Sequence, residues 1–525
     1  MKSDGQHEAV EGGWLRPVVE AAVGLAISVA VFRGFAIEGF MISTGSMAPT
    51  MYGYHKRVTC DACGLAFARG VAAPAAPGPV DASDSQTVAF EDLGLARCPN
   101  CDRPAETSAT PRNHGDQLLV LKHAFDFQPP RRWDSVVFRN PATPEKAYVK
   151  RVVGLPGESV RVVDGDVFID GEIARKPLDA IRQTRVLVHD TRYEPDDLPS
   201  RWQASDDPTG GEFRWLTYRH AIRGGGWQPA SVTIPEPFRE AVATIAFGTQ
   251  RLGFDAATGL LTARGALAER TVATLRQVSW DPAFTDPLEQ LVAASFHPPV
   301  TDRYGYNAGP SPGREHVVND LMLEVDVAIG ADAVVSLDLS DGRAAYRLTL
   351  DSVARRVTIE RQGGTEPLHE ASFEPREQNG RPLRIALAVI DGTATAVIDG
   401  EEPFAAIGHG VSRSPRPAAP PRVGTSGDAV VQRIMLYRDI YYTRGRGRNA
   451  VTEPHRLAAD EYFVLGDNSP VSLDSRGWEQ PAVPARLLIG KPFVVHLPSR
   501  PGSFTFGGSE RTFRVPDFSR VRLIR

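Results

Sequence analysis

Two residues far apart in the chain could form a nucleophile and its base. Ser46 lies in the run TGSMAPT (44–50), and Lys150 lies in the run YVKRVVGLPGE (148–158). A serine hydroxyl needs an adjacent proton acceptor to attack a carbonyl near neutral pH, and lysine fills this role in Ser-Lys enzymes. Free lysine has a pKa near about 10.4, so a lysine base must be desolvated. Val149, Val152 and Val153 predict such burial around Lys150.

The cysteines form a second pattern with chemical meaning. Cys60 and Cys63 make one CxxC pair, Cys98 and Cys101 make another, and the chain has 4 cysteines in all. Two such pairs suit tetrahedral zinc coordination by four thiolates, as in a zinc ribbon. Four protein ligands leave no open position on the metal, so we expect structural rather than catalytic zinc. Two disulfides are the alternative, if the domain lies in an oxidising compartment.

Composition places the chain among globular proteins with one local membrane signal. Its 525 residues suggest two to four domains, and a net charge of −5 with pI near 6.2 argues against nucleic-acid binding. Residues 17–32 are apolar except for Glu20, which predicts a retained transmembrane anchor over 13–37. A buried helix of a soluble domain and a cleaved signal peptide are the alternatives.

Strand patterns dominate the rest of the chain, so we expect a mainly β protein. Strands are predicted at 117–121, 134–138, 147–153 and 166–169, with Asp-Gly turns that mark hairpins. Apolar residues alternate in 321–329 and in several later runs, which predicts a β-sandwich of jelly-roll or concanavalin-like type at about 315–445. Residues 238–247 and 266–275 have helical character.

A third motif completes a family pattern. The run GDNSPVSLDSR (466–476), the serine run, the lysine run and the apolar anchor occur in the order found in bacterial type I signal peptidases, which this chain resembles. The resemblance covers roughly 13–57, 116–177 and 455–500. It implies an antiparallel β catalytic domain, interrupted by a zinc-ribbon-like insert and by a β-rich insert. The predicted divisions are a polar tail (1–12), the anchor (13–37), three catalytic parts (38–57, 116–177 and 451–525), the cysteine insert (58–115) and the β-rich insert (178–450).

The resemblance also implies roles for individual residues. Ser46 is the expected nucleophile and Lys150 the general base, while the Ser46 backbone N–H and the Thr44 hydroxyl are the expected oxyanion donors. Family members usually have serine where this chain has Thr44. The expected supporting residues, of which Ser472 would hold the lysine amine, are Ser472, Asp474, Arg476, Tyr148 and Arg151. The expected substrate-pocket residues are Ile42, Ser43, Met47, Met51 and Val149.

The implied function is removal of signal peptides from exported preproteins after a small-x-small motif, with no cofactor for catalysis. The expected location is the cytoplasmic membrane, with a single span and the catalytic domain on the outer side. Exported preproteins and the membrane are the expected partners, and the secretion translocon is a further candidate. The alternatives are a self-cleaving Ser-Lys regulatory protease and a non-catalytic envelope protein that binds through its sandwich.

Overall fold

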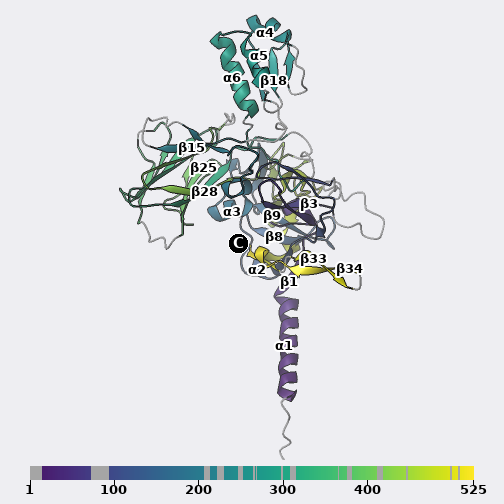
Figure 1. Cartoon of the computed structure of the whole chain (residues 1–525). Helices are drawn as coiled ribbons and strands as arrows, with labels where there is room; N and C mark the ends of the chain where they lie inside the picture. Colours follow the sequence, from purple (N-terminus) through teal and green to yellow (C-terminus); the bar gives the residue numbers. More distant parts are fainter. Residues whose placement is uncertain are drawn as a thin grey trace, which may run out of the picture.

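The computed structural model describes residues 15–72, 94–205, 213–220, 230–245, 252–263, 267, 269–296, 299–307, 315–364, 366–374, 381–410, 418–444, 447–496, 499–506 and 509–524. The predicted polar tail, 1–12, and most of the Gly- and Ala-rich loop of the cysteine insert lie outside these ranges. The body has two β-rich lobes, a small separate unit, and one helix that projects from it (Figure 1).

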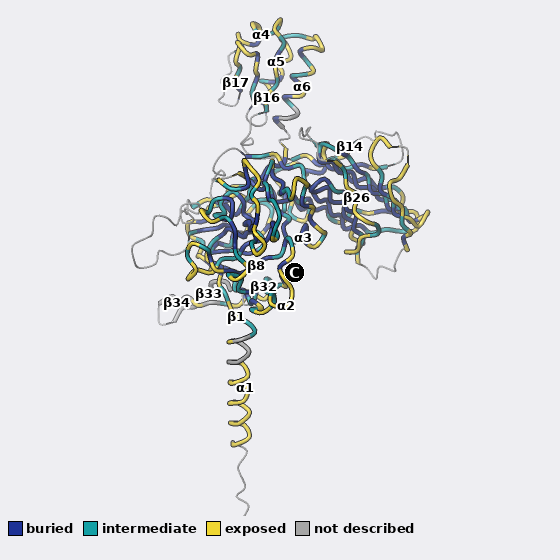
Figure 2. Tube along the Cα trace, turned by 180° about the vertical axis from the view of Figure 1, so that it is seen from behind, coloured by how far each residue is buried: buried dark blue, intermediate teal, exposed yellow. Residues whose placement is uncertain are grey.

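The helix that projects from the body is α1 (Leu15–Phe35). Its described side chains are exposed between Arg16 and Val29, and it is exposed along most of its length in Figure 2. No helix formed by the described residues is both long and apolar enough to cross a membrane. The predicted single span over 13–37 therefore stays a prediction.

An antiparallel, eight-stranded sheet carries the serine and lysine runs. Its strands, in spatial order, are β1 (Ile37–Met41), β7 (Gln117–Leu121), β32 (Leu488–His496), β8 (Ser135–Arg139), β9 (Ala147–Gly154), β30 (Glu461–Leu465) and β31 (Ala482–Pro484), and β35 (Arg522–Leu523) pairs with β32. The predicted strands at 117–121, 134–138 and 147–153 are confirmed to within one residue at each end. Strands from three separate parts of the chain thus meet in one sheet, as expected for a domain interrupted by inserts.

A smaller sheet covers the far end of β9. It contains β12 (Glu172–Ile173), β11 (Asp166–Ile169), β10 (Ser159–Val163) and β29 (His455–Arg456). The predicted hairpin is confirmed, because β10 and β11 pair through the turn at Asp164 and Gly165, both with positive φ.

The cysteine insert is built from two short β units. One has β2 (His55–Thr59), β3 (Ala66–Gly70) and β6 (Arg112–Asn113), and the other has β4 (Leu95–Arg97) and β5 (Pro104–Glu106). The two CxxC runs sit at the turns of the β2–β3 and β4–β5 hairpins. Each turn is closed by a backbone hydrogen bond, Gly64 N to Cys60 O at 2.9 Å and Asp102 N to Cys98 O at 2.9 Å.

The large insert folds into two antiparallel sheets packed face to face. One sheet has β13 (Val186–Asp190), β28 (Val430–Arg438), β19 (Leu321–Ala328), β24 (Leu383–Ile390), β25 (Thr393–Ile398) and β26 (Ile407–Gly408). The other has β14 (Trp202–Ser205), β15 (Arg214–Tyr218), β27 (Arg422–Ser426), β20 (Val334–Ser340), β21 (Ala345–Asp351), β22 (Arg356–Arg361) and β23 (His369–Ser372). Leu323 and Leu387 of the first sheet share one core with Leu337 and Leu348 of the second.

The sandwich begins earlier in the chain than the sequence predicted. β13, β14 and β15 lie before residue 315, yet β13 pairs with β28 and β15 with β27. The alternation along 321–329 does not correspond to one buried and one exposed face. Helix α3 (Leu178–Thr184) packs against the outer face, and β19 is buried on both sides.

A small unit with its own core lies apart from both lobes (Figure 1). It comprises β16 (Ala230–Thr233), β17 (Leu252–Asp255), β18 (Leu260–Ala263), α4 (Glu236–Ala243), α5 (Glu269–Arg276) and α6 (Pro282–Phe296). α4 and α5 lie where helical character was predicted. α6 was missed, because Pro287 inside it weakens the helical pattern.

Candidate active site

The run that begins at Gly466 holds the Ser46 loop through two hydrogen bonds from Asn468, here called the clamp. Ser46 lies in the 3-10 turn Gly45–Met47, which follows β1, and it is buried. The Asn468 backbone N–H donates to Ser46 O at 3.0 Å, and its side-chain amide donates to Gly45 O at 3.0 Å. A Cβ at Gly466 would lie 2.6 Å from Ser46 O, so only glycine permits this approach.

Lys150 and Ser46 are in direct contact. Lys150 lies on β9, where its side chain is 2% exposed, and its Nζ donates to Ser46 Oγ at 2.6 Å. Burial lowers the pKa of Lys150 to about 8, against the opposing pull of Asp474 and Asp467. A lysine amine with this pKa is neutral in part of the molecules near neutral pH, as a general base requires.

Two buried ion pairs surround the dyad without binding the amine. Arg476 Nε and Nη2 donate to the Asp474 carboxylate at 2.9 and 2.7 Å. Arg151 donates in the same two-pronged way to Asp467, at 2.8 and 2.7 Å. Each carboxylate is thereby matched by its own guanidinium, so neither holds the amine of Lys150 in the charged state by a direct bond.

Thr44, Ser472 and Tyr148 lie around the dyad in different ways. Thr44 Oγ1 is 3.3 Å from Ser46 Oγ, on the nucleophile's own loop. Ser472 Oγ is buried and has no hydrogen-bond partner among the described residues. The predicted bond between Ser472 and the amine is therefore not formed here. The Lys150 amine lies 5.8 Å from the centre of the Tyr148 ring, which stacks on Trp478.

The predicted pocket residues divide into two groups. Met47 and Met51 are 1% and 0% exposed and belong to the core beneath the sheet, with Ile42 beside them. They lie beneath the Ser46 loop, and their role in a substrate pocket stays a prediction. Ser43 is exposed and Val149 half-buried, so these two can face a substrate.

Comparisons with known proteins match the same parts of the chain. The family model described as "Signal peptidase, peptidase S26" matches residues 101–209 and 427–497, which include Lys150 and the Gly466–Arg476 run. These two segments are similar to the signal peptidase family, over 180 (109 plus 71) of the 525 residues. Ser46 lies outside the matched residues, so its place in the family pattern rests on its contact with Lys150.

Individual relatives are also signal peptidases. A signal peptidase I of Leptolyngbya laminosa is 42% identical over 77 residues, which are 13% of this chain and 37% of the relative. One of Pseudomonas fluorescens is 45% identical over 71 residues, 13% of this chain and 25% of the relative. The chain thus spans 37% and 25% of the length of these two relatives. A solved carbohydrate-binding module, CBM66 of Bacillus subtilis, is similar at 11% identity and a TM-score of 0.17, over 23% of this chain and 73% of that one. A score this low carries no argument about the sandwich.

The four cysteines of the chain converge on one point. The Cys60 and Cys101 sulfurs are 3.5 Å apart, as are those of Cys63 and Cys98, and all four lie within 4.8 Å of one another. Four sulfurs around zinc at about 2.3 Å would be separated by about 3.8 Å, so the donor set fits a tetrahedral zinc. All four are free thiols in this structure.

A segment of the large insert reaches the catalytic loop, which the sequence did not indicate. The side-chain amides of Asn307 and Asn468 form a reciprocal pair at 2.9 and 2.7 Å, and Asn307 is buried. Just before it, Tyr306 O accepts from Gly70 N at 2.8 Å. Residues 299–307 therefore connect the cysteine insert to the residue that clamps Ser46. Asn307 has no local motif, and only its partner across the fold reveals it.

Proposed function

We propose that this protein is a membrane-associated serine endopeptidase that removes signal peptides from exported preproteins. The observation that carries the proposal is the 2.6 Å contact between Ser46 Oγ and the buried amine of Lys150. The similarity to signal peptidases supports the substrate class, an N-terminal signal peptide. We propose that small residues precede the cut.

Lys150 and Ser46 would act in two half-reactions. When the Lys150 amine is neutral, its Nζ takes the Ser46 proton while Ser46 Oγ attacks the scissile carbonyl. The Ser46 N–H and the Thr44 hydroxyl would stabilise the oxyanion. Collapse of the tetrahedral intermediate breaks the peptide bond, and the Lys150 ammonium gives its proton to the leaving amine. A water activated by Lys150 then hydrolyses the acyl-enzyme and frees the signal peptide.

The substrate would dock as an extended strand beside the Ser46 loop. Strand addition supplies main-chain hydrogen bonds, and small subsites near Ser43 and Val149 would exclude large side chains. This arrangement would explain a small-x-small preference without charged recognition groups.

Membrane association would come through α1. Val18, Val19, Leu25 and Ile27 on this helix are each more than half exposed. Phe127, Phe518 and Leu523, on the body, are also exposed. These apolar side chains suit contact with lipid.

A single span with the catalytic domain on the outer side, and contact with the translocon, remain part of the proposal. Protease accessibility in spheroplasts tests the orientation.

A structural zinc held by Cys60, Cys63, Cys98 and Cys101 is also proposed. Its role would be to fix the two hairpin turns, because four thiolates leave no site for substrate. Elemental analysis of the purified protein should give about one zinc per chain, and a content near zero would refute the assignment.

The test of function is cleavage of a model preprotein with an Ala-x-Ala signal sequence. Detergent-purified wild type should cut it, whereas Ser46→Ala should not, and circular dichroism should show both folded. A matched control is Ser475→Ala, which changes a buried serine bonded to the Val464 N–H and outside the dyad. Failure of folded wild type on several preproteins, or cutting by Ser46→Ala, would overturn the proposal.

A further inference from the structure

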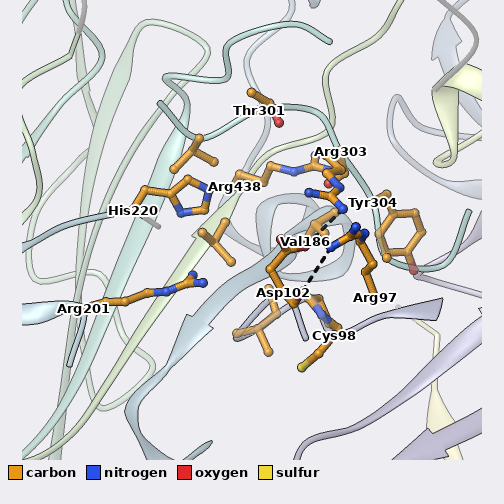
Figure 3. Close-up of a pocket in the computed structure, with 15 residues that line it drawn as sticks. Arg97, Cys98, Asp102, Val186, Arg201, His220, Thr301, Arg303, Tyr304 and Arg438 are labelled. Atoms are coloured by element: carbon orange, nitrogen blue, oxygen red, sulfur yellow. Dashed lines mark hydrogen bonds and ion pairs between the residues drawn. The ribbon is translucent and has the colours of Figure 1, made fainter. Parts of the chain in front are cut away.

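A small cavity lies where three parts of the chain meet. It has a volume of about 60 Å³ and is walled by the β4–β5 hairpin of the cysteine insert, by β13 of the sandwich and by residues 300–305. Figure 3 shows Arg97, Arg201, Arg303, Arg438 and His220 around it. The residues come from separate regions, so only the assembled fold creates this group of cations.

Positive charge on the wall exceeds negative charge. Asp102 is the one carboxylate among the lining residues, against four guanidinium groups. It is 3.1 Å from Arg303 and 3.5 Å from Arg97, so one carboxylate serves two arginines. Guanidinium groups thus outnumber carboxylates four to one among the residues that line the cavity, and in a partly enclosed space this favours an anion.

Arg438 differs from an exposed arginine because its charge is buried. Its side chain donates to three backbone carbonyls, Asp439 O at 2.8 Å, Asp302 O at 3.0 Å and Arg303 O at 3.2 Å, and the residue is 5% exposed. Carbonyls satisfy its N–H groups but do not neutralise its charge. Burial lowers the pKa of Arg438, and the nearby acids Asp302, Asp439 and Glu315 oppose this effect. No carboxylate of a described residue forms an ion pair with its guanidinium, so an anion in the cavity could add a direct contact to a buried cation.

We propose that this cavity binds a small tetrahedral oxyanion of the phosphate or sulfate class. Guanidinium groups match such oxygens in geometry and charge. A single water needs about 10–15 Å³ by the same measure of volume, so the cavity holds a few waters or one such ion. The site goes beyond the proposed peptidase function and does not depend on it.

A bound anion would strengthen the junction behind the catalytic loop. Thr301, Arg303 and Tyr304 line the cavity, and the same segment continues to Asn307, which pairs with Asn468. The anion would join this segment to the cysteine insert and to the sandwich through shared arginines. Removal of the anion should lower the stability of this junction more than the stability of either lobe.

The test is thermal unfolding and calorimetric titration of the full chain in detergent, with inorganic phosphate, sulfate or glycerol 3-phosphate added. Sodium chloride at equal ionic strength controls for screening. The variants are Arg438→Met and Arg97→Gln, and the matched control is Arg276→Gln, an arginine of similar exposure to Arg97 that pairs with Glu289 far from the cavity. Zinc content is measured in each, since Arg97 adjoins Cys98.

We expect phosphate to raise the unfolding temperature of wild type above the chloride control, with one ion bound per chain. Each cavity variant should weaken binding at least about tenfold, and Arg276→Gln should bind like wild type. A larger shift with glycerol 3-phosphate would support the site and identify its ligand as a phosphate ester. No excess shift over chloride in wild type, or binding retained by both cavity variants, would overturn the proposal.

Discussion

Two buried lysines in this molecule have opposite electrostatics. Lys150, in the catalytic sheet, has its pKa lowered to about 8 by burial. Lys176, at the junction with the sandwich, is equally buried, yet its pKa is raised well above the ordinary value. Burial lowers the pKa of Lys176 too, but Asp391 and Asp439 bind its amine at 3.0 and 2.8 Å and outweigh that effect.

The difference lies in where the carboxylates are bound. Asp474 and Asp467 near Lys150 are each held by an arginine, whereas Asp391 and Asp439 hold Lys176 directly. Burial alone therefore does not make a lysine a base. The neighbouring acids must also be engaged by other cations, and this separates a lysine suited to catalysis from one that joins two domains.

Lys150→Met should have the largest effect of the variants that test the contrast between the two lysines. We expect activity to fall by a factor of at least about 10³, because the base is lost. Stability at pH 7 should be unchanged or higher, since removal of a lysine whose pKa is lowered from 10.5 to about 8 relieves a cost of up to about 3 kcal/mol. Preprotein cleavage and denaturant unfolding measure the two effects. A large loss of stability would mean that Lys150 is held as a paired cation.

Lys176→Met should give the opposite result. Removal of this amine leaves Asp391 and Asp439 buried without their cation, so we expect a loss of about 3–5 kcal/mol in the free energy of unfolding. Activity per folded molecule should persist. The control is Lys491→Met, whose pair with Asp134 is partly exposed and should cost about 1 kcal/mol or less. Equal stability of the two variants would contradict the distinction drawn above.

The pH dependence of cleavage tests whether the pKa of Lys150 is lowered, in contrast to that of Lys176. With neutral Lys150 as the proposed base, kcat/KM should rise about tenfold per pH unit below pH 8 and level off above it. The same group should add stability as pH rises from about 8 to 10.5, because the unfolded chain binds the extra proton in that range. A rate profile governed by a group near pH 6 would point to a histidine base.

The smallest expected effect is at the clamp on the Ser46 loop. Asn307→Ala leaves the Asn468 amide without its partner, and we expect kcat to fall about 5- to 30-fold, equivalent to about 1–2 kcal/mol, with KM little changed. Asn113→Ala is the control, a buried asparagine of the cysteine insert whose side chain makes no hydrogen bond. Equal kcat for Asn307→Ala and wild type would show that the clamp does not position Ser46.

Residue type and order were enough to predict the serine and lysine site and the local strands. Ser46, Lys150 and the Gly466–Arg476 run could be recognised because type and order survive in a linear chain, and β7 to β9 because alternation is local. The pairing of Arg151 with Asp467, and of Lys176 with Asp391 and Asp439, could be known only from the folded structure, and with it the reason why Lys150 and Lys176 differ. It also brought β13 to β15 into the sandwich, buried both faces of β19 and set Asn307 against Asn468. These features depend on partners more than a hundred residues away, and short-range periodicity carries no information about such partners.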